Sequence, residues 1–335
     1  MSVQTRLVRA WYQKSIWLYG LLPFSLIFKV LSTIRRLILQ FYHQGRPFKI
    51  PVIVIGNISI GGSGKTPFLM ALAKALSQRG YRVGVVSRGY GGRGAEYPMN
   101  VLPTSDPSIC GDEPLLISRS CACPVVVDPV RSRAVLAIIE QFSCDVVLSD
   151  DGLQHYSLHR DVEIAILDAT RGLGNGWLLP AGPLREAVSR LSQVDFVVAN
   201  GQGEPSEMAA SDVFVTLEPV GLRKFGSDEV VYAESLGEIT QVHAVAAIGN
   251  PERFADTLRV MGYEPILHKK DDHQCLALED LSFKDSLPVI ITAKDAVKFV
   301  DSAPDNLWVL DVEMLLSEIF LDNICHRAGI TSTQS

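Results

Sequence analysis

A glycine-rich loop between a buried strand and a helix constrains the fold of this chain more than any other feature. Residues 51–56 (P-V-I-V-I-G) form a short apolar run with β-branched residues, typical of a strand in a parallel sheet. The loop N-I-S-I-G-G-S-G-K-T follows at 57–66, and Pro67 suits the first turn of a helix, where its missing N–H costs nothing. Apolar residues then recur at helical spacing up to Leu76. Strand, loop and helix in this order predict a nucleotide-binding P-loop.

The residue types of this loop suit the binding of a nucleoside triphosphate. Its glycines let backbone N–H groups approach phosphate oxygens at the positive end of the helix. Lys65 can reach the β- and γ-phosphates, and the Thr66 hydroxyl can ligate Mg²⁺. Ser59 stands where the general pattern G-x-x-x-x-G-K-[ST] has its first glycine. We predict ATP and Mg²⁺ as cofactors and the following ATP-binding residues: Ser59, Ile60, Gly61, Gly62, Ser63, Gly64, Lys65 and Thr66.

Two adjacent carboxylates follow a second apolar run. The sequence D-V-V-L-S at 145–149 reads as a strand that ends in Asp150 and Asp151. This is the usual position of the acidic residue that holds Mg²⁺ in a P-loop fold. A solvated turn is the alternative for adjacent acids at a strand end, and the P-loop favours the metal site. We therefore expect Thr66 and Asp150 to ligate the metal.

Alternating strand and helix patterns indicate a parallel sheet covered by helices. Strand-like runs occur at 82–87, 124–128, 145–149, 162–167 and 195–199, and a helical pattern covers 130–142. Further along, 212–217 and 228–233 read as two strands around Gly221 and Gly226, which suggests an antiparallel linker. A second α/β unit is predicted from a strand at 243–248, a helix at 251–261, strands at 288–292 and 307–311, and a last helix near 315–327.

The N-terminal third is strongly basic. No Asp or Glu occurs before Glu96, whereas residues 1–95 carry fourteen Lys or Arg. This asymmetry points to an anionic partner, which is nucleic acid, nucleotide or an acidic membrane surface. Residues 15–34 are largely apolar, and basic residues flank both ends. This apolar content, and the lack of a recognition motif for nucleic acid, favour lipid.

The apolar segment at 15–34 has four interpretations. A cleaved signal peptide is disfavoured because no small-residue cleavage site follows. A spanning helix is marginal because the segment contains Pro23 and Lys29. An ordinary core helix remains an alternative. We favour a helix lying in the membrane interface on the cytosolic side, since it explains the aromatic residues beside the cations, namely Trp11, Tyr12, Trp17 and Tyr19.

These patterns predict an α/β fold with a P-loop NTPase-like parallel sheet domain, an N-terminal membrane-associated helix and a second, smaller α/β domain joined by a β linker. The expected segments are a helical membrane-associated segment (1–45), the P-loop core (46–210), the two-stranded linker (211–239) and the C-terminal α/β domain (240–335).

Six strings combine in one order along the chain. They are V-I-G-N-I-S-I-G-G-S-G-K-T-P (54–67), V-S-R-G-Y-G-G (86–92), G-D-E-P (111–114), D-D-G-L-Q-H (150–155), R-G-L-G-N-G-W-L-L-P-A-G-P-L-R-E (171–186) and K-D-A-V-K (294–298). Their order and spacing closely resemble the tetraacyldisaccharide 4′-kinase family of lipid A biosynthesis. The similarity extends over essentially the whole chain, including the apolar N-terminus.

The resemblance implies a kinase at the cytoplasmic face of the inner membrane of Gram-negative bacteria. Such enzymes use ATP and Mg²⁺ to phosphorylate the 4′-hydroxyl of an acylated glucosamine disaccharide 1-phosphate, which gives lipid IV-A. The expected partners are this lipid and the membrane surface, with no nucleic acid and no obligate protein partner. Ser59 agrees with the family, which lacks the first glycine. Ala293 departs from it, since Glu is expected before K-D-A-V-K.

The resemblance also assigns residue roles. It makes Asp112 of G-D-E-P the catalytic base, although the residues alone favour a helix N-cap before the apolar run at 115–117. His273 matches the position whose imidazole partners the base, which would place the reaction in a cleft between two domains. Candidates for contacts with phosphate, or with water, metal or the substrate sugar, are Arg88, Arg131, Arg185, Asp151, Gln154 and His155. A solvated surface charge is the alternative for each arginine.

Two other functions compete with a lipid kinase. A membrane-associated regulatory P-loop ATPase, without a lipid acceptor, would carry a second Lys early in the loop, where Ser59 and Ile60 stand. A membrane-tethered nucleotide-binding scaffold would leave Asp112 and the pair at 150–151 without a purpose. Transfer of phosphate to an acceptor distinguishes all three.

Overall fold

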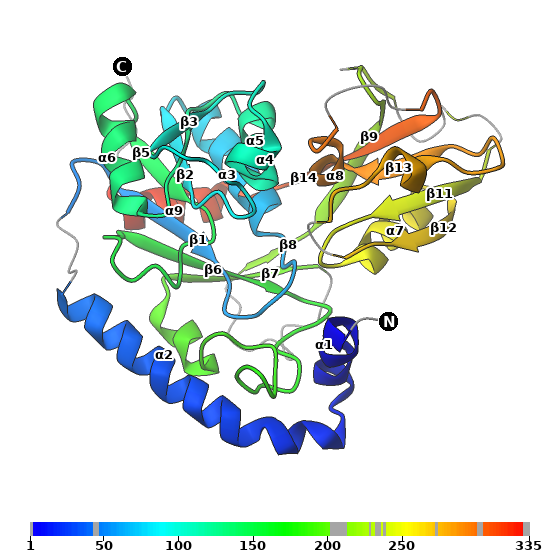
Figure 1. Ribbon diagram of the computed structural model, residues 1–335. Helices are drawn as coiled ribbons and strands as arrows, with labels where there is room; N and C mark the ends of the chain where they lie inside the picture. Colours follow the sequence, from blue (N-terminus) through cyan, green and yellow to red (C-terminus); the bar gives the residue numbers. More distant parts are fainter. Residues whose placement is uncertain are drawn as a thin grey trace.

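Two β-sheets, one of eight strands and one of six, organise the protein (Figure 1). The computed structural model describes residues 3–42, 47–201, 213–227, 229–231, 236, 239–271, 274–299 and 304–330. We call the part built on the larger sheet the first unit and the part built on the smaller sheet the second unit.

The larger sheet has the strand order β3-β4-β2-β5-β1-β6-β7-β8. All neighbouring strands are parallel except β3, which pairs antiparallel with β4 at the edge. The five strand-like runs predicted after the P-loop strand are thereby confirmed. The strands are β1 (Val52–Gly56), β2 (Val83–Ser87), β3 (Met99–Val101), β4 (Val125–Val127), β5 (Val146–Ser149), β6 (Val162–Asp168), β7 (Phe196–Asn200) and β8 (Val213–Val215).

Helices cover both faces of this sheet, so its central strands are buried on both sides. On one face, α3 (Lys65–Gln78), α5 (Asp112–Ser120) and α9 (Glu318–Ala328) share a core with the strands. The short helix α4 (Pro107–Cys110) lies on this face too, next to α5. On the other face, α6 (Arg131–Gln141) and the short helix η2 (Val188–Gln193) share a second core with the strands. Burial on both sides explains why the strands read as continuous apolar runs, and each buried Leu, Ile or Phe contributes about 1.5–3 kcal/mol.

The smaller sheet has the order β10-β9-β14-β13-β11-β12. Four of its strands are parallel, and β9 joins β14 antiparallel. The strands predicted at 243–248, 288–292 and 307–311 and the helix at 251–261 are confirmed. The elements are β9 (Leu217–Lys224), β10 (Val230–Val231), β11 (Gln241–Ala246), α7 (Pro251–Val260), β12 (Glu264–Lys269), η4 (Leu278–Leu281), β13 (Val289–Thr292), α8 (Ala293–Ala296) and β14 (Leu307–Met314).

The antiparallel pairing predicted between 212–217 and 228–233 is wrong. β8 pairs with β7 in the larger sheet, whereas β10 pairs with β9 in the smaller one. The reason is that Gly221 does not turn the chain: it lies within β9 opposite Asp311, next to a shift in register. The turn comes at Gly226, whose φ is +80°. The boundaries of the four predicted segments remain a prediction.

The N-terminal segment forms α1 (Val3–Gln13), η1 (Ile16–Leu21) and α2 (Leu22–Tyr42), which lie along the lower edge of the molecule (dark blue in Figure 1). Within the described residues, Ile16–Phe41 is long and apolar enough to cross a membrane by length and composition. Pro23 stands in the first turn of α2 and does not interrupt it. Nine large apolar side chains of α2 are 48–78% exposed: Phe24, Leu26, Ile27, Val30, Leu31, Ile34, Leu37, Ile38 and Phe41. An ordinary core helix is therefore the wrong interpretation.

Two of the four aromatic residues expected in a membrane interface are instead packed inside the protein. Trp11 is 4% exposed, and its Nε1 donates a hydrogen bond to the Pro180 carbonyl at 3.0 Å. The ring of Tyr12 lies against the Arg171 guanidinium. Trp17 and Tyr19 are more than half exposed, as the interface interpretation requires.

Candidate active site

The P-loop has the backbone shape that its glycines predict. Gly61 and Gly64 have φ angles of +112° and +86°, which favour glycine. A Cβ on Gly64 would also lie 1.9 Å from the Asn200 Nδ2. Because α3 begins directly afterwards at Lys65, the free N–H groups of its first turn lie at the loop and form a site for phosphate oxygens.

Two neighbouring segments hold this loop in place. The Asn57 Nδ2 donates to the Ser63 Oγ at 3.1 Å and to the Gly61 carbonyl at 3.4 Å. On the other side, the Ile60 N–H donates to the Pro183 carbonyl at 2.8 Å. Ser59 forms a β-bridge with Leu184 and has no positive φ, so this position does not need the glycine of the general pattern.

Asp150 is a carboxylate suited to a cation. It is 1% exposed, and burial, followed by the charge of Glu113, raises its pKa to about 7. Its Oδ2 lies 3.5 Å from the Ser87 Oγ, and its buried Oδ1 accepts no hydrogen bond from the described residues. A buried oxygen without a partner, near the hydroxyl of Thr66 in the same cleft, fits a hard cation such as Mg²⁺.

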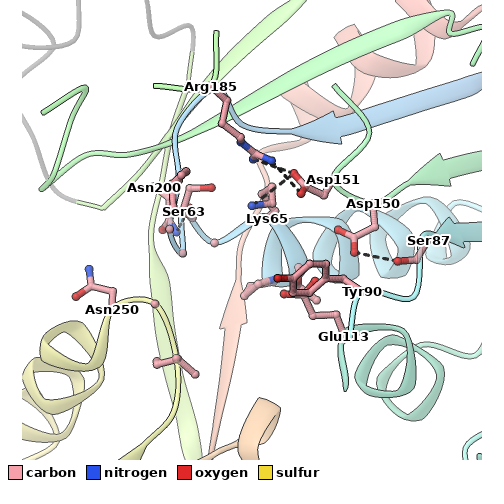
Figure 2. Close-up of a pocket in the computed structure, with 18 of the residues that line it drawn as sticks. Ser63, Lys65, Ser87, Tyr90, Glu113, Asp150, Asp151, Arg185, Asn200 and Asn250 are labelled. Carbon is pink, nitrogen blue, oxygen red and sulfur yellow. Dashed lines mark hydrogen bonds and ion pairs between the residues drawn. The ribbon is translucent and has the colours of Figure 1, made fainter. Parts of the chain in front are cut away.

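Asp151 is held as an anion, unlike its neighbour. Burial would raise its pKa, but Lys65 and Arg185 more than offset this effect, so the pKa lies well below its ordinary value. The Lys65 Nζ is 3.6 Å and the Arg185 Nη2 is 3.2 Å from the Asp151 Oδ1. Figure 2 shows Arg185, Lys65 and both aspartates converging on one side of the pocket. Asp151 has a φ of +44°, so the turn is strained to aim this side chain.

The three candidate arginines have different surroundings. Arg131 is 4% exposed, and its Nη2 donates to the backbone carbonyls of Asp150 and Asp151, so a solvated surface charge is wrong for it. Arg185 is half-buried and also donates to the Asn57 Oδ1. Arg88 is exposed and lines the cleft.

A polar cluster beyond Asp151 was only partly predicted. The Gln154 Nε2 donates to the Asn57 carbonyl at 2.9 Å and to the Glu186 Oε1 at 2.5 Å. The Tyr156 hydroxyl donates to the other oxygen of Glu186. Burial, with Arg131 and Arg160 nearby, lowers the pKa of His155 to about 4, so its imidazole is neutral. Glu186 and Tyr156 were missed, although each stands at or next to the end of a recognised string.

Asp112 is the first residue of α5, and the alternative of an N-cap is wrong because Gly111 occupies that position. Its Oδ1 accepts a hydrogen bond from the Glu113 N–H at 2.9 Å. The second unit supplies two cations here. The Lys298 Nζ lies 3.9 Å from the Asp112 Oδ2, and the Lys294 Nζ lies 2.9 Å from the Glu113 Oε1.

These contacts give K-D-A-V-K a place in the site, which the sequence did not assign. Its lysines meet the two acids of G-D-E-P across the two units. Glu113 and Ala293 both line the cleft, whereas Asp112 is 9% exposed. His273, the predicted partner of Asp112, lies outside the described residues.

A cleft of about 1710 Å³ joins most of these groups, but the predicted site residues Ser59 and Asp112 do not line it. Its lining runs from α2, through the P-loop and the aspartate pair, to the facing surface of the second unit. The predicted residues that line it are Ile60 to Thr66, Arg88, Arg131, Asp150, Asp151, Gln154, His155 and Arg185. A cation-rich phosphate site therefore shares one cavity with the apolar helix α2, which suits a phosphorylated amphipathic ligand.

Comparison with known proteins agrees with this geometry. The family model described as tetraacyldisaccharide-1-P 4′-kinase matches residues 17–328. Tetraacyldisaccharide 4′-kinase of Hahella chejuensis is 42% identical, covering 95% of each chain. The enzyme of the same name from Stutzerimonas stutzeri is 44% identical, covering 96% of each. A crystal structure of LpxK from Aquifex aeolicus in complex with ATP matches with a TM-score of 0.74 at 26% identity, covering 93% of this chain and 99% of that one. The chain therefore belongs to the tetraacyldisaccharide 4′-kinase family.

Proposed function

We propose that this protein transfers the γ-phosphate of ATP to the 4′-hydroxyl of a tetraacyldisaccharide 1-phosphate at a membrane surface. Membership of the family makes the protein a kinase of lipid A biosynthesis that uses ATP with Mg²⁺. The observation that carries the proposal is that the P-loop, the aspartate pair and the exposed apolar helix α2 border one cleft. A regulatory ATPase without a lipid acceptor is not favoured, since it would need no lipid-sized cavity.

Thr66 and Asp150 are the proposed ligands of Mg²⁺. The fit rests on the Asp150 Oδ1, which is buried and accepts no hydrogen bond from the described residues. When bound, the ion would supply positive charge that offsets the negative charge developing on the β- and γ-phosphates during transfer. Lys65 binds the same two phosphates, and it would exchange its contact with Asp151 for them. Arg185, Arg88 and Arg131 remain candidates for phosphate contacts.

Asp112 is the proposed general base for the 4′-hydroxyl. Phosphoryl transfer to an alcohol releases a proton, which a carboxylate within reach accepts. This carboxylate stands at the N-terminus of α5, and the Lys298 Nζ lies 3.9 Å from its Oδ2. His273 is proposed to orient Asp112. The second unit would then contribute two side chains to the base.

The membrane contact is proposed for α2, on the cytoplasmic face of the inner membrane. The exposed apolar side chains of α2 can enter the boundary between headgroups and acyl chains. Its two ends are fixed to the first unit: the Ser25 Oγ donates to the Leu178 carbonyl at 2.8 Å, and the Arg36 Nη2 donates to the Gln193 Oε1 at 2.7 Å. A helix held along the protein over this length supports an interfacial position rather than a spanning one. Lys29 and Arg35 line the cleft from α2, where they can meet the 1-phosphate.

Transfer of label from γ-labelled ATP to the lipid tests the proposal. The full-length protein with Mg²⁺ and a tetraacyldisaccharide 1-phosphate in mixed micelles should produce a labelled lipid, and Lys65→Ala should not. Release of labelled inorganic phosphate alone, with lipid present and unlabelled, would overturn the kinase function and favour an ATPase.

A further inference from the structure

One buried side chain, Asn200, connects the P-loop to the second unit. It is the last residue of β7 and is 1% exposed. Its Nδ2 donates to the Ser63 carbonyl at 3.0 Å. Its Oδ1 accepts a hydrogen bond from the Arg253 Nη2 at 2.7 Å, and its backbone carbonyl lies 3.4 Å from the Arg253 Nη1. Both ends of the carboxamide are therefore engaged within the protein.

Arg253 belongs to α7, and a second link beside it joins the same two parts. Asn250 caps α7, accepting a hydrogen bond from the Arg253 N–H at 3.4 Å. The Asn250 Nδ2 donates to the Asp168 Oδ2 at 3.2 Å at the end of β6. Figure 2 shows Asn250 below Asn200 and Ser63, at the start of α7.

Close contacts couple the position of the P-loop to that of Asn200. The carboxamide packs against Gly64, where a Cβ would lie 1.9 Å from its Nδ2. On the neighbouring side, a Cβ on Gly62 would lie 3.6 Å from the Gly249 Cα of the second unit. The P-loop peptide between Ser63 and Gly64 is therefore positioned by Asn200, and Asn200 is oriented by Arg253.

We propose that Asn200 is a positioning residue that transmits the docking of α7, through Arg253, to the P-loop peptide at Ser63 and Gly64. ATP affinity and phosphoryl transfer then depend on how the second unit sits against the first. The inference rests on the proposed kinase function and adds to it a route by which the second unit controls the nucleotide site.

A double-mutant cycle on the full chain tests this route. The variants are Asn200→Ala, Arg253→Ala and their combination, with Arg259→Ala as the matched control, since Arg259 is exposed on the same helix and pairs with Asp256. Equilibrium binding of ATP with Mg²⁺ is measured together with kcat, KM for the lipid and the melting temperature. Each single variant should weaken ATP binding about tenfold and lower kcat, with KM for the lipid unchanged. In the Asn200→Ala background, Arg253→Ala should change ATP affinity by less than about twofold.

Asn200→Asp separates the two hydrogen bonds of the Asn200 side chain. It keeps the acceptor for Arg253 and removes the donor to the Ser63 carbonyl. It should weaken ATP binding without lowering the melting temperature. If Asn200→Ala does not fold, Asn200→Ser takes its place in the cycle. An equal loss from Arg253→Ala in both backgrounds would mean that Arg253 contacts the nucleotide directly and would overturn the proposal, as would unchanged ATP binding in Asn200→Asp. The ATP-binding measurements test the role of Asn200 even if no lipid is phosphorylated. Failure of this proposal can therefore be told apart from failure of the proposed kinase function.

Discussion

Adjacent residues in the cleft carry opposite electrostatic environments. Burial and the charge of Glu113 raise the pKa of Asp150 to about 7, whereas Lys65 and Arg185 overcome burial and keep the pKa of Asp151 low. The turn therefore presents one carboxylate whose burial and like-charged neighbours outweigh the cations near it, and one that forms ion pairs with two cations. A divalent cation supplies what the first lacks, and a triphosphate competes for the cations of the second.

Replacing Asp150 by Asn tests whether this carboxylate binds the divalent cation. We expect kcat at saturating Mg²⁺ to fall by roughly two orders of magnitude or more, because the ion's stabilisation of the transition state is worth several kcal/mol. The metal-free protein should melt at the same temperature or higher, since a buried and poorly compensated charge has been removed. A variant with nearly normal kcat, measured across a Mg²⁺ titration, would exclude Asp150 as a ligand.

His155 gives a pH dependence whose sign follows from its lowered pKa. Burial, then Arg131 and Arg160, shift this pKa from 6.5 to about 4. Because the unfolded chain binds the proton at the higher pH, the contribution of His155 to stability is present above 6.5 and is lost as the pH falls toward 4. In His155→Gln, melting temperatures measured across this window in the metal-free protein should depend less on pH. An unchanged slope would assign the acid sensitivity to other groups.

At the scale of elements, α2 combines an exposed apolar face with contacts that fix it to the first unit. Deleting the N-terminal segment would be a poor test of membrane binding, because it would also remove Trp11 from its contact with Pro180. Substitutions on the exposed face leave these contacts in place.

We expect Leu26→Glu with Leu37→Glu to abolish cosedimentation with anionic phospholipid vesicles. Both side chains are at least 60% exposed, and burying each in the membrane interface is worth about 1.5–3 kcal/mol. KM for the lipid should rise at least tenfold, whereas ATP affinity should be unchanged. Val260→Glu is the control, since this side chain is 82% exposed on α7 in the second unit. Retained vesicle binding in the double variant would place the membrane contact elsewhere.

The elements differ in how far the sequence could predict them. Six strands of the larger sheet (β1, β2 and β4 to β7) were predicted because burial on both faces produces continuous apolar runs, whereas the short edge strand β3 was not. β9 was not predicted either, since only two adjacent residues of 217–224 are buried and the run includes Pro219 and Gly221. An aromatic residue beside cations gives the same sequence pattern whether it lies in a membrane interface or is buried in the protein. Trp11 was therefore predicted in the wrong environment.

The residues of the site also differ in how far the sequence could predict them. The P-loop is contiguous, so its residues, spacing and glycine conformations follow from local sequence. The pairing of Lys294 with Glu113 joins residues 181 positions apart, and no local pattern encodes such a contact. The same holds for Asn200, which reads as an ordinary residue at the end of a strand.

At the scale of the whole molecule, α9 closes the core of the first unit after the chain has passed through the second. Phe320 is 2% exposed, and its ring lies 6.3 Å from that of Phe68 and 5.5 Å from that of Phe196. The second unit is thus entered through β9 and left through β14, two strands that pair with each other.

Phe320→Ala should destabilise the first unit, and with it the P-loop, by about 3–5 kcal/mol. Chemical denaturation followed by loss of ATP binding measures this effect. Ile319→Ala, one residue away and 75% exposed in the wild-type protein, should be nearly neutral. If Phe320→Ala were as neutral as Ile319→Ala, α9 would not contribute to this core.

This return of α9 also sets an order of events during synthesis. The P-loop is translated early, but α9, which completes its supporting core, emerges from the ribosome only after every strand of both sheets. The part of the α3 surface that α9 covers therefore stays exposed while the entire second unit is made. Such a chain offers a long interval for capture by chaperones, and the membrane contact proposed for α2 would be available before the nucleotide site is complete.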